Sequence, residues 1–151
     1  MVKTRASSEK TNFWNQMDVV SCGFLQVDSG GMKISKQYDL EKRTFLFAKD
    51  VRAFVKRLKM TYANQEDGRQ LIRSFGSVGA NYIEANESFS KKDFLMRIKI
   101  CRKEAKESKY WLNLVDLQST PDLEERRKDL RDEAGELTSI FGSIISKSEK
   151  K

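Results

Sequence analysis

The 151-residue sequence contains no histidine, one proline and two cysteines. Without histidine, the chain cannot form a hydrolase triad that uses imidazole or a zinc site with a histidine ligand. Cys22 and Cys101 are too few for a disulfide framework and indicate a reducing compartment. The single proline predicts long, uninterrupted helices. These shortages argue against an enzyme and against a bound cofactor or metal ion.

Long apolar runs are also missing. Asp18, Ser21, Gly23 and Gln26 interrupt the first thirty residues, so no targeting segment is expected there. No stretch approaches the roughly 18 apolar residues of a membrane span. With 34% charged and 38% hydrophobic residues at the length of one domain, the sequence predicts a cytoplasmic globular protein without a membrane partner.

Residues 1–37 differ from the rest, because their aromatic residues and glycines follow no sustained period. We expect a weakly ordered N-terminal extension. The alternative is an arm that docks on a partner or on the domain, and Met32 is a possible native start.

From Tyr38 to Ser146 the apolar residues recur at helical spacings of three, four and seven. They predict four helices: Asp39–Lys59, Gln65–Ser88, a third from the cap Ser90 to a break at Gln118–Thr120, and Pro121–Ser146. Short connections favour an all-α, antiparallel up-down-up-down four-helix bundle over 38–146, followed by a charged, frayed tail at 147–151. The expected core positions are Leu40, Phe47, Val51, Phe54, Leu58, Leu71, Phe75, Val78, Tyr82, Ala85, Phe94, Ile98, Cys101, Ala105, Ser108, Leu112, Val115, Leu123, Leu130, Ala134, Leu137, Phe141 and Ile144.

Three local signals refine this plan. Ser90 followed by Asp93 forms a capping box, and Thr120 followed by Pro121 starts the last helix. The second helix contains a run of small residues that includes Gly76 and Gly79. Each glycine costs a helix about 1 kcal/mol relative to alanine, so the run predicts either a close neighbouring helix or a kink.

Basic residues gather on one side of the third helix, within an arc of roughly 100° away from the core positions. Such a stripe is typical of phosphate binding, and we expect the first helix to contribute further contacts. The predicted nucleic-acid contacts are Lys49, Arg52, Lys56, Lys92, Lys99, Arg102, Lys103 and Lys106. A solvated lysine-rich face is the simpler alternative, and no regularly interleaved aromatic residues provide a stacking platform.

A lateral face of the same helix groups Arg97, Glu104, Glu107 and Trp111. A tryptophan among charged residues outside the core predicts an oligomer interface. Equally, its ring can cover the side of the bundle within one chain.

Asn81 and Glu84 lie three residues apart beside the small-residue run. We interpret them as structural polar residues that pair with Lys106, Lys109 or backbone groups; the alternative is a ligand or nucleic-acid contact. An all-carboxylate metal site from Glu84, Glu104 and Glu107 is less favoured than structural ion pairs.

The sequence also resembles a known family. The stretches Leu71–Ser74, Ser77–Ala85, Ser90–Phe94 and Glu104–Leu112, together with Tyr38-Asp39-Leu40, resemble the bacterial four-helix-bundle proteins called 23S ribosomal RNA intervening-sequence proteins. The resemblance covers about residues 38–146. Gly79 stands where some branches have proline, Ala85 where they have glycine, and Phe75 is bulkier than expected.

This resemblance implies small bundles that assemble as ring-like homopentamers and have no known catalytic residues. Some relatives are encoded within insertions in large-subunit ribosomal RNA genes, and a related group assists retroelement reverse transcriptases through a basic surface. We therefore expect a non-enzymatic bundle that self-associates and binds RNA or a ribonucleoprotein. The alternative is a protein-interaction scaffold that does not contact nucleic acid.

Overall fold

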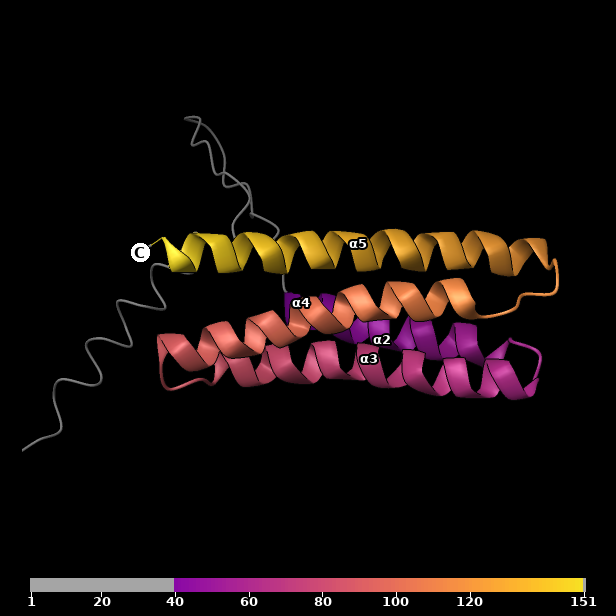
Figure 1. The fold of residues 1–151 in the computed structure, drawn as a ribbon, viewed down its shortest axis with the longest axis horizontal. Coiled ribbons are helices and arrows are strands. Elements are labelled where there is room, and N and C mark those ends of the chain that lie inside the picture. The colour runs from indigo at the N-terminus through magenta and orange to yellow at the C-terminus, as the bar shows by residue number, and fades with distance from the viewer. Residues whose placement is uncertain (1–39, 151) are drawn as a thin grey trace, which may run out of the picture.

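The computed structural model describes residues 40–150, which form four helices and, within that range, no strand (Figure 1). The helices are α2 (Leu40–Lys56), α3 (Tyr62–Asn86), α4 (Lys91–Leu114) and α5 (Pro121–Glu149). The α2–α3 and α4–α5 connections lie at one end of the bundle, and the α3–α4 connection lies at the other (Figure 1). The predicted extension at 1–37, with Cys22, lies outside the described residues.

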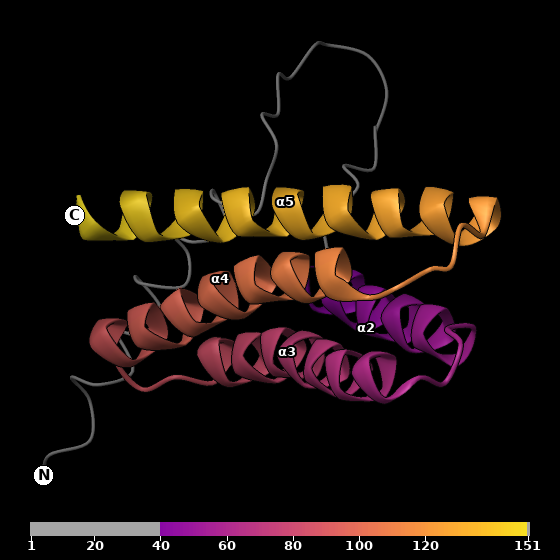
Figure 2. The same cartoon turned by 45° about the vertical axis from the view of Figure 1, so that its right-hand side comes forward.

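The helices surround one core, with α2 and α4 at opposite corners. Both α2 and α4 pack against α3 and against α5. Figures 1 and 2 agree that α2 lies behind α4, with α5 above and α3 below. The outward faces of α2 and α4 therefore point to opposite sides of the molecule.

The predicted core positions are buried, with one exception. Four phenylalanines, Phe54, Phe75, Phe94 and Phe141, are at most 1% exposed. Tyr82 is the exception: it is half-buried, and its ring centroid lies 6.0 Å from that of Phe141. The core positions predicted from the sequence thus face a common interior.

Helix boundaries differ from the prediction where local hydrogen bonds intervene. The α2 helix ends at Lys56, three residues early, because the backbone N–H groups of Arg57 and Leu58 donate to carbonyls only three residues back. The α3 helix begins at Tyr62 rather than Gln65, because the Thr61 hydroxyl accepts a hydrogen bond from the Asn64 N–H at 3.1 Å.

The predicted start of α4 is confirmed, since the Ser90 hydroxyl accepts from the Asp93 N–H at 3.1 Å. Pro121 occupies the first turn of α5, and Thr120 holds the N-cap position without a side-chain cap bond. The helix continues to Glu149, past the predicted end at Ser146, so most of the expected frayed tail is helical. Gln118 and Ser119 in the preceding loop have positive φ angles of 48° and 58°.

Within residues 40–150, five polar residues are buried, and each makes a structural hydrogen bond: Thr44, Asn64, Ser74, Ser88 and Ser108. Asn64, which is 2% exposed, donates to the carbonyls of Lys59 at 3.0 Å and Asp116 at 2.9 Å and accepts from the Asp116 N–H at 2.8 Å. Ser108 donates its hydroxyl to Ser74 at 2.9 Å or to the Glu104 carbonyl at 2.7 Å, which joins α3 to α4. Thr44 and Ser88 donate to carbonyls of their own chain segments.

The α3 helix is continuous through the small-residue run. A Cβ on Gly76 or Gly79 would meet α2 side chains only at 3.7 Å or more, an ordinary contact distance. The tight approach is instead at Gly68, where a Cβ would lie 3.0 Å from Val55 Cγ1. The predicted close packing of helices thus occurs at a glycine outside the run.

Candidate nucleic-acid interface

The α4 helix separates its charges onto two flanks. One flank faces α3 and holds all three carboxylates of the helix: Asp93, Glu104 and Glu107. Arg97 and Trp111 lie on the same flank. The remaining basic residues of α4 lie outward or toward α5: Lys91, Lys92, Lys99, Arg102, Lys103, Lys106 and Lys109. This separation creates one surface of a single sign.

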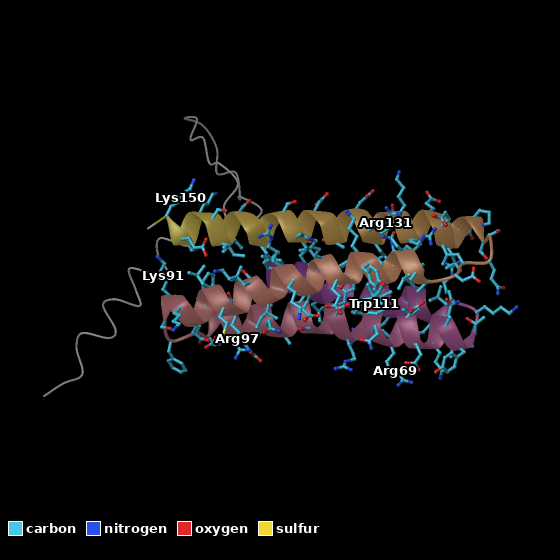
Figure 3. The ribbon with its side chains drawn as sticks, in the orientation of Figure 1. Arg69, Lys91, Arg97, Trp111, Arg131 and Lys150 are labelled. Atoms are coloured by element: carbon cyan, nitrogen blue, oxygen red, sulfur yellow. The ribbon has the colours of Figure 1, made fainter. Side chains whose placement is uncertain are left out.

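On the α3 flank, Arg97 is the centre of a polar network. Its guanidinium pairs with Glu84 of α3, donates to Asn81 Oδ1 at 3.3 Å and lies 3.9 Å from Asp93. Asn81 also donates to the Ser77 carbonyl at 2.9 Å, so the predicted backbone partner is confirmed for Asn81. The predicted partners Lys106 and Lys109 were wrong, because these lysines lie on the other flank of α4. Arg97 and Trp111 both point toward α3 in Figure 3. The network joins the middle of α3 to the start of α4.

Trp111 is half-buried and packs against the core. Its indole N–H donates to Glu107 Oε1 at 3.1 Å, and its ring makes an edge contact with Tyr110 at 5.1 Å. Glu104 accepts from Lys103 at 3.3 Å. These contacts occupy Arg97, Glu104, Glu107 and Trp111 within one chain, as the side-covering alternative predicts.

The five predicted contacts on α4 form one exposed array: Lys92, Lys99, Arg102, Lys103 and Lys106. Lys99 pairs with Glu149 of α5 at 2.7 Å, and Lys103 pairs with the adjacent Glu104. Over residues 40–150, Lys92, Arg102 and Lys106 have no carboxylate within 4.0 Å. The array therefore retains uncompensated positive charge.

The three predicted contacts on α2, by contrast, are not part of that array. Arg52 donates to the Ala48 carbonyl at 3.1 Å and lies beside Gly76 of α3, and Lys49 lies 5.8 Å from the Phe45 ring centroid. Lys56 is also exposed on α2. Because α2 and α4 occupy opposite corners, the eight residues form two separate surfaces rather than the single one expected.

Two further cations belong to the α4 array and were missed. Lys109 lies against Gly135 of α5, and Arg131 is four residues before Gly135 and so on the same face of α5. The sequence holds a signal for this arrangement: Arg102 and Lys109 are seven residues apart, as are Gly135 and Gly142. Equal spacing on two neighbouring helices predicts repeated contacts between them.

A shallow groove of about 730 Å³ lies at the start of α4. Leu95, Met96 and Ile100 contribute its apolar surface, and the side chains of Lys91, Lys92, Lys99 and Lys103 complete its lining. The groove thus combines apolar contact area with four positive charges.

The rest of the described structure bears on the other sequence expectations. Within residues 40–150, no group of three or more cysteine, aspartate or glutamate side chains is arranged to hold a metal ion, and no helix is long and apolar enough to cross a membrane.

Cys101 is fully buried beside the Val78 carbonyl, and burial raises the pKa of its thiol from 9.0 to about 12.

Comparison with known proteins identifies the family. The family model described as 23S rRNA-intervening sequence protein matches residues 36–143. A crystal structure of a protein of unknown function from the S23 ribosomal protein family of Bacteroides thetaiotaomicron is similar, with 28% identity and a TM-score of 0.59 over 70% of this chain and 97% of that chain. Among curated proteins, none matches. The chain therefore belongs to the 23S rRNA-intervening sequence protein family.

Proposed function

We propose that this protein is a cytoplasmic, non-enzymatic, antiparallel up-down-up-down bundle that binds RNA or a ribonucleoprotein through the outward surface of α4. The observation that carries the proposal is the charge separation on α4. Seven basic side chains share the outward and α5-facing sides, whereas all three carboxylates of the helix lie toward α3.

Uncompensated cations on a rigid helix suit a phosphate backbone better than a protein surface of mixed charge. Lys92, Arg102 and Lys106 have no carboxylate within 4.0 Å in the described part of the chain, so a phosphate does not have to displace an internal ion pair. Binding of this kind releases counterions and weakens steeply as salt rises. The RNA named in the family description agrees with this class of ligand.

Crosslinking tests this proposal directly. The full chain is irradiated with the RNA that copurifies with it, the RNA is sequenced, and the crosslinked peptides are mapped by mass spectrometry. We expect crosslinks on peptides of α4 and few on those of α2, the other basic helix surface. Absence of copurifying RNA, or crosslinks confined to α2, would contradict the proposal.

We also propose self-association, with a homopentamer as the state that the resemblance implies. Tyr110 and Leu114 of α4 are 57% and 46% exposed next to Trp111, which offers apolar area at the predicted interface. Light scattering should give a mass several times that of one chain. A monomer at high micromolar concentration would exclude self-association and leave the RNA proposal standing.

The groove at the start of α4 favours a second candidate function, a protein-interaction scaffold. Leu95, Met96 and Ile100 give it apolar area that phosphate contacts do not use. A protein partner that remains bound after nuclease treatment and in high salt would support the scaffold. A partner lost under both treatments would support RNA binding instead.

A further inference from the structure

The contact between α4 and α5 places positive charges directly above glycines. A Cβ on Gly142 would lie 3.4 Å from Arg102 Nε, and one on Gly135 would lie 3.6 Å from Lys109 Nζ. The two cationic groups therefore rest against bare helix backbone, two turns apart. We define the α4–α5 seam as the three basic residues Arg102, Lys109 and Arg131 together with Gly135 and Gly142.

Arg131 adds an unusual feature to the seam. Arg131 lies on α5 (Figure 3). It is four residues, about one turn, before Gly135, so the two residues share a face of the helix. Its Nε is buried and has no hydrogen-bond partner within residues 40–150. A buried donor without an acceptor is rare and costly in a folded protein, and residues 40–150 supply no acceptor for this atom.

The neighbouring carboxylates do not supply that acceptor. On the α4-facing side of α5, Glu149 pairs with Lys99, and Glu124 pairs with Arg127 at 2.6 Å. In the described structure none of the three seam cations has a carboxylate within 4.0 Å. The seam is thus a line of three cations without an ion-pair partner among residues 40–150.

The spacing indicates which anion fits. Seven residues of helix rise about 10.5 Å, so the groups above Gly135 and Gly142 are too far apart for one phosphate to bridge. A chain of phosphates reaches both. We propose that the α4–α5 seam binds consecutive phosphate groups of a nucleic-acid backbone, with Arg131 as a ligand-binding residue. This inference rests on the proposed function and places its RNA-binding site at the α4–α5 seam.

The test uses full-length protein, a fluorescent 12-nucleotide oligo(U) probe and, separately, sodium triphosphate. Arg131→Met removes the unpartnered Nε, and Arg73→Met on the exposed side of α3 is the matched control. We expect Arg131→Met to keep or raise the melting temperature, to weaken oligo(U) binding about three- to tenfold, and to reduce the salt slope by about 0.7 to 1. The control should change neither binding nor the slope.

Triphosphate separates the seam from the proposed function. We expect it to shift the NMR amide signals of Gly135 and Gly142 in the wild type and not in Arg131→Met. Shifts without oligo(U) binding would support the seam as an anion site and refute RNA binding. If Arg131→Met leaves RNA binding unchanged, the seam is refuted as the binding site, whereas RNA binding by the protein stands. A lower melting temperature of Arg131→Met with unchanged affinity would show a structural role and also overturn the inference.

Discussion

The side-chain amide of Asn64 exchanges two hydrogen bonds with the backbone of Asp116, 52 residues later in the chain. Asn64 Nδ2 donates to the Asp116 carbonyl at 2.9 Å, and the Asp116 N–H donates to Asn64 Oδ1 at 2.8 Å. The same amide also donates to the Lys59 carbonyl. One buried side chain therefore joins the α2–α3 connection to the segment between α4 and α5.

Asn64→Ala should lower the free energy of unfolding by about 2 kcal/mol, because it leaves backbone groups of Lys59 and Asp116 without their partner. Urea denaturation measures the change. Asn113→Ala is the control, since Asn113 is exposed on α4 and its replacement should change stability by only about 0.5 kcal/mol. Equal effects of the two substitutions would refute the role given to Asn64.

Glycine replacements in α3 should differ by position. Gly79→Ala should stabilise the protein by about 0.5–1 kcal/mol, because alanine favours the helix and the new methyl group meets Thr44 only at 3.7 Å. Gly68→Ala should destabilise it by about 1 kcal/mol, because its methyl group would lie 3.0 Å from Val55. Thermal unfolding of the two variants checks the order, which a reversed ranking would contradict.

The Cys101 thiol should be unreactive in the folded protein. Burial raises its pKa from 9.0 to about 12, so at pH 9 little thiolate forms, and the side chain is fully enclosed. Alkylation by iodoacetamide at pH 9, measured on a Cys22→Ser chain, should be slow without denaturant and fast in urea. Rapid native-state labelling would contradict the burial of this thiol.

The same pKa change has a consequence for stability. Because the folded-state pKa is raised, the stabilising contribution of the neutral thiol is complete below pH 9.0 and is lost as the pH rises toward about 12. Stability should therefore fall less steeply over this range in Cys101→Ala than in the unsubstituted chain. Identical slopes would exclude the thiol as a contributor.

The helices and their inner faces were predictable, because the spacing of apolar residues reports burial directly. The relationships between helices were not. Arg97, rather than Lys106 or Lys109, reaches Glu84, and this choice depends on the flank of α4 that faces α3. Asn64 was missed because its partner Asp116 is distant in the sequence.

For the same reason, the eight predicted nucleic-acid contacts form two separate surfaces rather than one. Spacing along α2 and along α4 identifies a basic side on each helix, but only the arrangement of the bundle shows that the two sides point in opposite directions. Lys109 and Arg131 were missed because their position depends on the contact between α4 and α5. Local sequence thus predicted which side chains are outside, and packing determined which of them are neighbours.

The salt dependence of RNA binding by two matched triple variants tests the central claim most directly. One variant is Lys92→Gln, Arg102→Gln, Lys106→Gln on α4, and the other is Lys49→Gln, Arg52→Gln, Lys56→Gln on α2. For a single-stranded probe, the α4 variant should reduce the slope of log affinity against log salt by about 2, and the α2 variant should leave it unchanged. An equal loss in both variants, or a wild-type affinity independent of salt, would contradict binding through the outward surface of α4.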